Sequence, residues 1–296
     1  MYKLYEDIAS GSYKHGPYKT FTVCDNKKRE IRVASIRDRV VHRLIYDYLV
    51  ALYDHTFIYN VWSCRENKGL IGAITRSQHL LSANPHAYVW RADISKFFDN
   101  VGQSVLWGIL ARKVKDPNAL KLLEEIIASY PRERERERDE RPSGVLPGFR
   151  RGMPIGNLTS QILANIYLNE LDRFVKHTIK PKAYLRYGDD FILVASDLEW
   201  LRAQRQRITV FLASELKLSV NRKSDIIIKT KNGIHFLGVE IYPTGRRLKK
   251  RNWYRAITLL SPKNYSSYSG LVKQHGSEKK KKHFDWKLAQ LYDEFI

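Results

Sequence analysis

Residues 183–194 read AYLRYGDDFILV, and this stretch places Asp189 and Asp190 side by side within a mostly apolar run. A Gly-Asp pair between two runs of strand-forming residues predicts a β-hairpin with its tip near Gly188. Two adjacent carboxylates repel each other unless a cation compensates them, and Mg²⁺ typically binds one or two carboxylates together with substrate phosphates. The stretch therefore predicts an ordinary aspartate-rich turn or, if another acid joins it, a metal site.

Asp93 is the candidate for that further acid. It lies near the end of the segment AYVWRADI, residues 87–94, which we interpret as a strand. If this strand lies beside the hairpin, Asp93 and Asp189 can share two ions roughly 3.5–4 Å apart, which activate a hydroxyl and stabilise a leaving pyrophosphate. Such a site performs phosphoryl transfer by positioning and charge stabilisation. The simpler alternative for Asp93 is the N-cap of a helix.

The net charge of the chain points to a polyanionic partner. Its 296 residues carry a formal net charge of +21, from 52 lysines and arginines against 31 acidic residues. Nucleic acid is a better candidate for that partner than an acidic membrane surface. The excess is concentrated in residues 246–283, where basic and aromatic residues alternate in a way that suits phosphate contacts and base stacking. A solvated helical surface is the alternative for this segment.

The sequence contains no apolar run long enough for a membrane span, and its first residues, MYKLYEDIAS, lack the apolar core of a signal peptide. We therefore expect a cytoplasmic protein with no membrane partner. Cys24 and Cys64 match neither a metal-binding spacing nor a disulfide framework, and we expect reduced thiols.

Periodicity predicts helices and strands that intermix without regular βαβ spacing, which favours an α+β fold. We expect a strand and then a helix within residues 28–53. Further helices are expected over 104–129, 157–177 and 198–217 and in the basic C-terminal segment, and strands over 225–229 and 234–242. The charged segment 131–142, PRERERERDERP, is interpreted as an exposed loop or a short solvated helix.

Three strings resemble motifs A, B and C of reverse transcriptases, in that order: ADISKFFDNV, GMPIGNLTSQILANIYLNELDRFV and RYGDDFILV. The string KREIRVASIRDRVVHRL is similar to the fingers motif that precedes them in this family. NGIHFLGVEIYP is similar to the primer-grip hairpin that follows the palm. Together the matches cover roughly residues 28–250 in the order of the family.

The resemblance implies a right-hand polymerase, an α+β fold with fingers, a palm of antiparallel sheet and helices, and a short helical thumb. We expect the fingers over residues 1–86, the palm over 87–102 and 151–245, a fingers or palm insertion over 103–150, and the thumb over 246–296.

The resemblance also implies roles for individual residues. Asp93, Asp189 and Asp190, with the backbone of Ile94, are expected to bind two Mg²⁺ ions, for which Mn²⁺ can substitute. Lys223 resembles a lysine that protonates the leaving pyrophosphate, although a surface lysine is the alternative. The residues expected to bind the incoming deoxynucleotide triphosphate are Lys28, Arg29, Arg37, Ser95, Lys96, Phe97, Phe98, Ile155 and Gly156. The primer 3′ end is expected at the primer grip, formed by Phe236, Leu237 and Gly238.

Phe98 matches the steric-gate position of the family. An aromatic ring there collides with a ribose 2′-hydroxyl, so deoxynucleotides are the implied substrates. The alternative is a core phenylalanine packed beside Phe97.

Residues 155–161, IGNLTSQ, differ from the Gln-Gly-x-x-x-Ser-Pro pattern of most reverse transcriptases and are similar to the enzymes of diversity-generating retroelements. This resemblance implies error-prone, adenine-mutagenic cDNA synthesis from a template-repeat RNA. The implied partners are template RNA, the cDNA/RNA hybrid, deoxynucleotides and a small basic accessory variability protein. Because Ile155 has neither donor nor acceptor where most enzymes carry glutamine, we hypothesise that it weakens discrimination against mispairs.

Other functions stay open at this point. Reverse transcriptases of retrons and group II introns are close alternatives. An RNA-dependent RNA polymerase also carries Gly-Asp-Asp, although Phe98 argues against it. A non-enzymatic RNA-binding protein is disfavoured by the intact set of Asp93, Asp189 and Asp190.

Overall fold

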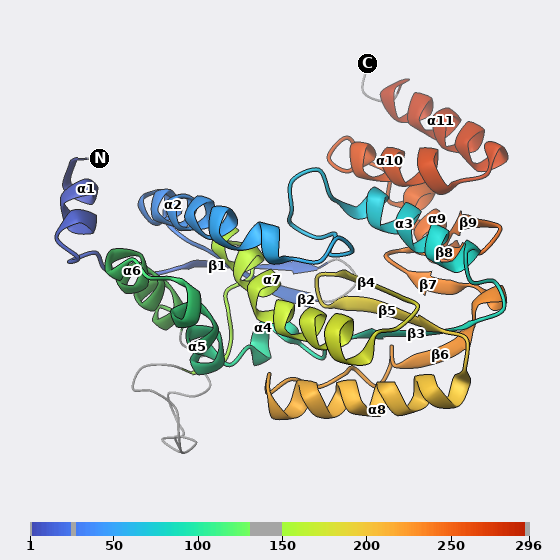
Figure 1. The fold of residues 1–296 in the computed structure, drawn as a ribbon. Coiled ribbons are helices and arrows are strands. Elements are labelled where there is room, and N and C mark those ends of the chain that lie inside the picture. The colour runs from blue at the N-terminus through green and yellow to red at the C-terminus, as the bar shows by residue number, and fades with distance from the viewer. Residues whose placement is uncertain (1, 25–27, 131–149, 294–296) are drawn as a thin grey trace.

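A four-stranded antiparallel sheet organises the molecule (Figure 1). The computed structural model describes residues 2–24, 28–130 and 150–293. The strand order is β4 (Ala183–Tyr187), β5 (Asp190–Ala195), β3 (Tyr88–Asp93) and β6 (Ile226–Lys229). β4 and β5 form the predicted hairpin with Gly188-Asp189 as its turn, and the prediction of that hairpin is confirmed.

One face of this sheet is covered by two helices, α7 (Leu158–Arg173), which continues as a π-helical stretch (Phe174–Ile179), and α8 (Leu198–Ser214). Strand side chains alternate between the two faces, so Trp90, Phe191 and Leu193 point into this helix-covered side, where they are fully buried. They form the main apolar core with residues of both helices.

The opposite face is only partly covered. A small antiparallel sheet packs there, formed by β7 (Ile234–Phe236), β8 (Val239–Tyr242) and β9 (Gly245–Leu248), together with α3 (Leu70–Ser82). Val89 and Ile192 are buried beneath it. The ends of β3 and β5 that carry the aspartates lie beyond that apolar cluster. The segment predicted as strand over 234–242 is therefore a hairpin.

The N-terminal part of the chain lies at one end of the molecule (Figure 1). It contains α1 (Tyr2–Ala9), the hairpin β1 (Lys19–Cys24) and β2 (Lys28–Val33), α2 (Ile36–Tyr53), and a short 3₁₀ turn (Asp54–Thr56). α5 (Gln103–Lys113) and α6 (Pro117–Ala128) pack beside it. The prediction of helical structure over 104–129 is confirmed, and the segment consists of two helices because Asp116 caps a new helix through the amides of Asn118 and Ala119, with Pro117 in its first turn.

The C-terminal segment forms three helices at the other end of the molecule, α9 (Lys250–Thr258), α10 (Tyr265–His275) and α11 (Glu278–Asp293). Leu248, Ala256, Val272 and Phe284 give them a small buried core of their own. The prediction of a helical basic segment is confirmed. Two short elements complete the described chain, α4 (Phe97–Asn100) and a 3₁₀ turn (Thr230–Asn232).

The α+β class is confirmed, whereas the expected limits of fingers, palm, insertion and thumb stay predictions. The charged segment 131–142 lies outside the described residues. None of the helices within the described ranges is long and apolar enough to cross a membrane.

Candidate active site

The three aspartates singled out in the sequence meet at one end of the four-stranded sheet. Asp93, the last residue of β3, is paired directly with Asp190, the first residue of β5. Residues opposite each other in an antiparallel pair project to the same face, so both carboxylates lie on the partly covered face. Asp189 precedes Asp190 in the turn, and its carbonyl accepts a hydrogen bond from the Ile94 amide at 3.2 Å. All three are half-buried.

The loop before β6 holds Asp93 in place. The Asn221 amide donates to the Asp93 carbonyl at 2.9 Å, and its side-chain amide donates to the carboxylate at 3.3 Å. The hydroxyl of Ser224 donates to the other carboxylate oxygen. The predicted general acid, Lys223, is exposed on this same loop, and its backbone amide bonds the Asn221 side chain at 3.1 Å. Sequence reasoning named Lys223 but missed Asn221 and Ser224.

Asp190 carries the electrostatic signature of crowded acids. Burial, followed by the charge of Asp189 and later that of Asp93, raises its pKa to about 6. Arg91, two residues before Asp93 and on the same face of β3, opposes this shift through an ion pair with Asp190 at 3.6 Å. Burial and the neighbouring carboxylates thus both disfavour the charged form of Asp190.

This donor set fits a hard divalent cation, because Asp93 and Asp190 occupy paired positions on one face with Asp189 adjacent, and such cations bind carboxylate oxygens. Within the described ranges, no three acidic, histidine or cysteine side chains already converge as a ready-made metal cage. In this arrangement the Asp93 carboxylate accepts hydrogen bonds from Asn221 and Ser224, and Asp190 pairs with Arg91. Asp93, Asp189 and Asp190 are the residues that would hold the ions.

A buried polar network supports the turn from the helix-covered face. Arg186 of β4 and Asp172 of α7 form a fully buried ion pair, with nitrogen–oxygen distances of 2.6 to 3.1 Å. The same guanidinium donates to the side chain of Asn165 at 3.1 Å and to the Gly188 carbonyl at 3.0 Å. The Gly188 amide donates to the Ser63 hydroxyl at 2.8 Å.

Both backbone groups of Gly188 are therefore held by buried side chains, and the conformation of the turn that carries Asp189 is determined from beneath. Sequence reasoning missed Arg186, Asp172, Asn165 and Ser63. A signal was present, because alternation along β4 puts Arg186 on the same face as the buried Tyr184, where an arginine requires a partner.

The loop before α7 docks on the N-terminal hairpin. The Ile155 carbonyl accepts from the Arg32 amide at 2.9 Å, and the Asn157 side chain bonds both the Ala34 amide and the Arg32 carbonyl. Gly156 has a φ of 114°, and a Cβ there would lie 2.8 Å from Ile31. The half-buried Ile155 and the exposed Gly156 are thus fixed against β2.

The turn after Asp93 brings the other candidate nucleotide-binding residues next to the carboxylates. Ser95 is tied to the loop before β6 through the Ser219 carbonyl at 2.8 Å, and Lys96 is exposed with a left-handed φ of 44°. Phe97 is buried in the core. Phe98 is only half-buried, with its ring centroid 5.2 Å from that of Phe97.

The basic residues expected to grip the triphosphate lie on the N-terminal hairpin and on α2. Lys28 and Arg29 begin β2, and the Arg29 side chain is exposed. Arg37 forms ion pairs with Asp7 at 2.8 Å and Asp38 at 3.2 Å. Arg37 therefore ties α1 to α2 in this structure, and a role at the triphosphate would require it to exchange these partners.

The predicted primer grip is a tight turn between β7 and β8. Leu237 and Gly238 both have positive φ, at 48° and 87°, as a two-residue hairpin of this kind requires. Phe236 is fully buried and anchors the hairpin, and Asn252 of α9 donates to the Gly238 carbonyl at 2.7 Å.

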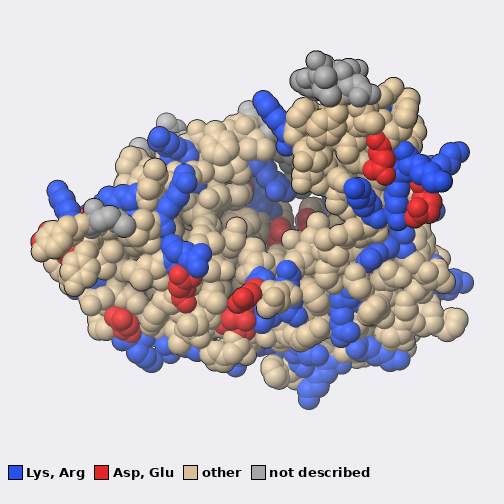
Figure 2. Space-filling view, turned by 90° about the horizontal axis from the view of Figure 1, so that it is seen from above, with Lys and Arg blue, Asp and Glu red and all other residues tan. Residues whose placement is uncertain are grey.

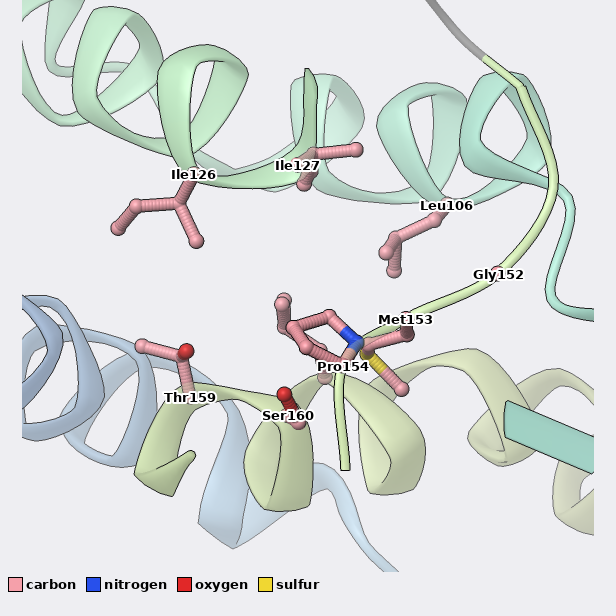
Figure 3. A pocket seen from close by; sticks show the side chains of 9 residues that line it. Leu106, Ile126, Ile127, Gly152, Met153, Pro154, Thr159 and Ser160 are labelled. Carbon is pink, nitrogen blue, oxygen red and sulfur yellow. The ribbon is translucent and has the colours of Figure 1, made fainter. Parts of the chain in front are cut away.

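The face viewed from above is hollowed, with acidic side chains at the base of the hollow and lysines and arginines around it (Figure 2). A separate small cavity lies behind the start of α7, between α5 and α6 and the residues Met153 and Pro154 (Figure 3). Its volume of about 10 Å³ leaves room for no more than one water, so we interpret it as a packing gap.

Comparison with known proteins decides the family. Residues 14–241 match the model of the family described as reverse transcriptase (RNA-dependent DNA polymerase), which is more than half of the chain and contains Asp93, Asp189 and Asp190. The chain belongs to this reverse transcriptase family. The sequence-based expectation of an RNA-directed DNA polymerase, a nucleotidyltransferase, is confirmed at this level.

Two curated proteins are similar to this chain over most of its length. Protein YkfC of Escherichia coli K12 is 23% identical over 295 residues, covering 87% of this chain and 74% of YkfC. The group II intron-encoded protein LtrA of Lactococcus lactis is 19% identical over 340 residues, covering 88% of this chain and 54% of LtrA. The present chain thus spans about half the length of LtrA.

The fold is that of right-hand polymerases. The Sicinivirus 3Dpol RNA-dependent RNA polymerase superimposes with a TM-score of 0.58 at 16% identity, covering 99% of this chain and 67% of the viral enzyme. Because the viral protein makes RNA on the same fold, the fold alone does not choose the nucleotide, and that choice rests on individual residues.

Proposed function

We propose that this reverse transcriptase extends a primer with deoxynucleotides on an RNA template at the site formed by Asp93, Asp189 and Asp190. The observation that carries the proposal is the direct pairing of Asp93 with Asp190, with Asp189 adjacent in a turn held by Arg186 and Ser63. Residues distant in the chain thereby offer their carboxylates on one face of the sheet. The net charge of +21 suits a nucleic-acid substrate.

When bound, two divalent ions, Mg²⁺ or Mn²⁺, supply activation of the primer hydroxyl and stabilisation of the leaving pyrophosphate. The chain contributes the positioning. Asp93 and Asp189 are the principal ligands, with Asp190 as a third carboxylate and the Ile94 backbone beside them. Lys223, on the loop that bonds Asp93, is suited to deliver a proton to the pyrophosphate. Arg29 and Lys96, both exposed, are available to the triphosphate.

Primer extension on a defined RNA template tests this function. Asp189→Asn is expected to abolish synthesis while binding of the primed template is retained. Glu199→Gln, at an exposed position of α8, is the control for removal of an acid and should extend primers like the unmodified protein. Retained synthesis by Asp189→Asn would reject the site, and loss of template binding together with synthesis would leave a structural role for Asp189 instead.

Phe98 supports deoxynucleotides over ribonucleotides as substrates. Its half-buried ring follows the turn that bears Asp93, which suits a steric gate beside the sugar. We expect Phe98→Ala to incorporate ribonucleotides that the unmodified enzyme rejects. Equal use of both sugars by the unmodified enzyme would favour the RNA-dependent RNA polymerase alternative.

At a finer level, we propose that synthesis is error-prone, as in diversity-generating retroelements, with a template-repeat RNA and a small basic accessory protein as partners. Support comes from Ile155, whose side chain offers no hydrogen bond where most reverse transcriptases carry glutamine. The likeness to the group II intron-encoded protein LtrA favours the alternative, an enzyme of the group II intron kind.

The mutagenic proposal and the group II intron alternative can be separated by sequencing cDNA. The cDNA is made by the unmodified enzyme and by Ile155→Gln, each with and without a candidate accessory protein. The mutagenic proposal expects frequent errors at template adenines that Ile155→Gln reduces. Faithful copying of adenines by the unmodified enzyme would support the group II intron kind.

A further inference from the structure

Two cations lie beside the catalytic carboxylates without a described role. Arg91 shares the face of Asp93 and approaches Asp190 to 3.6 Å, while its buried Nε makes no hydrogen bond within the part of the chain that the structure describes. This ion pair is longer and less complete than the buried pair of Arg186, although both arginines sit in the same sheet. The Arg91 side chain is 23% exposed, and this long ion pair leaves guanidinium N–H groups other than the buried Nε for a further acceptor.

Lys249 lies close to this arginine and to the primer-grip turn. It directly follows β9, whose last residue, Leu248, pairs with Val239. Lys249 is thus at the end of the small sheet where Leu237 and Gly238 form their turn. The bond from Asn252 to the Gly238 carbonyl keeps the start of α9 against that turn.

The surroundings of Lys249 are electropositive. Burial, then the charges of Arg91 and Arg251, lower its pKa, and Glu240 and Asp190 offset this only in part. Glu240 is itself shared with Arg247, which forms an ion pair with it, and with His235 at 3.7 Å. Among the described residues, Lys249 forms no ion pair of its own. Lys249 therefore adds positive charge near Arg91, whose own charge is offset in part by Asp190.

We propose that Arg91 and Lys249 bind one backbone phosphate of the primer strand close to its 3′ end. This inference rests on the proposed function. It goes beyond the primer grip because it assigns a charged phosphate site to side chains of β3 and of the β9–α9 junction. Arginine and lysine converging on one oxyanion make charge-assisted hydrogen bonds that orient the strand.

The position of Arg91 distinguishes this phosphate from the incoming triphosphate. β3 runs from Arg91 to Asp93 and then into the turn of Ser95 and Lys96, where the triphosphate is expected. Arg91 lies on the other side of Asp93 along the strand, toward the small sheet that carries the primer-grip turn. A phosphate held there belongs to the strand that delivers the 3′-hydroxyl to the carboxylates.

Binding of primed RNA templates, measured by fluorescence anisotropy without divalent ions or nucleotides, tests the site. One series of primers carries a single neutral methylphosphonate at each of the linkages nearest the 3′ end. For the unmodified protein, one linkage is expected to lower affinity by about 10-fold, and the other linkages much less. Arg91→Gln and Lys249→Gln should lose about 10-fold with the unmodified primer, and the slope of log affinity against log salt should fall by about one.

The decisive outcome is non-additivity. With the primer whose methylphosphonate weakens binding to the unmodified protein, Arg91→Gln and Lys249→Gln should each lose no further affinity. Lys115→Gln removes an exposed charge between α5 and α6 and should keep the full linkage dependence. Arg91→Lys keeps the positive charge and should keep part of the linkage dependence. This result would show that Arg91→Gln loses a contact with the phosphate and does not misfold the sheet.

A full further loss at that linkage in both glutamine variants, or an unmodified protein indifferent to every linkage, would overturn the proposal. Because the measurement needs neither metal nor nucleotide, its result is independent of DNA synthesis. A protein that shows linkage-specific binding but makes no DNA would contradict the proposed function and keep this site.

Discussion

The two faces of the β4–β5 hairpin treat charge in opposite ways. On the helix-covered face, Arg186 and Asp172 are fully buried and satisfied by hydrogen bonds to each other, to Asn165, to Tyr184 and to the Gly188 carbonyl. On the partly covered face, three aspartates crowd together, and the Arg91 ion pair only partly offsets the raised pKa of Asp190. A buried network of opposite charges gives a turn its shape, whereas a half-buried cluster of like charges suits a cationic ligand.

The largest effect is expected from removing a carboxylate on the partly covered face. Asp93→Asn should lower the rate of DNA synthesis by at least about 10³-fold, because a metal ligand that acts in the transition state is lost. The free energy of unfolding should change little or rise slightly, since one of three repelling charges is removed. Steady-state primer extension and urea unfolding of the same preparation measure both quantities. A variant that unfolds much more easily would show that Asp93 serves the fold instead.

Breaking the buried ion pair on the helix-covered face should mainly lower the free energy of unfolding. Arg186→Met leaves Asp172 buried without its partner and is expected to lower the free energy of unfolding by about 3–5 kcal/mol. The double variant Arg186→Met/Asp172→Leu removes both charges and should recover part of that loss. Urea denaturation of the two variants checks this expectation. If the double variant is no more stable than the single one, an uncompensated Asp172 charge is not the cause.

A second buried network, in the N-terminal part of the chain, extends the comparison to pH. His42 of α2 is buried between Thr159, at 2.5 Å, and His15, at 3.0 Å. Burial, and then the charge of His15, lowers the pKa of His42 to about 4. The unfolded chain, with an ordinary histidine pKa, takes up a proton that the folded chain refuses, so stability is complete above that ordinary pKa and is lost as the pH falls toward 4.

For His42 alone, this loss amounts to about 2 kcal/mol at about pH 5. Comparing urea unfolding at that pH and near neutrality for the unmodified protein and for His42→Gln measures it. The variant should have a shallower pH dependence, with a remaining slope from His275, whose pKa burial also lowers to about 4. An unchanged slope in His42→Gln would show that other groups dominate.

The smallest effect is expected at the turn between the two faces. Gly188 has a φ of 63°, and a Cβ added there meets no atom within 4 Å. Gly188→Ala should therefore lower the free energy of unfolding only by about 1 kcal/mol, through left-handed backbone strain without a clash. Gly188→Asn should cost less, because asparagine tolerates this conformation better. Thermal melting of both variants checks the order, and a larger loss for asparagine would indicate that space, and not backbone strain, limits this position.

The amino-acid sequence by itself determined the local features that carry the chemistry. The Gly-Asp turn, the strand that ends at Asp93 and the helix after Asn157 follow from short-range preferences, which act between residues near one another in the chain. Their resemblance to reverse transcriptase motifs supplied the expected roles, and the family match supports the enzyme class. Within the segment predicted as helical over 104–129, the local capping signal of Asp116 and Pro117 begins a second helix.

Only the tertiary structure decided which distant residues share a site. The register that sets Asp93 opposite Asp190 depends on which strands become neighbours and on how the apolar side chains of both faces pack. The side-chain partners of Arg186 come from α7 and the turn after β4, and its backbone bonds the segment between α2 and α3. Such contacts are absent from any local pattern, because they arise from burying several elements at once around a common core.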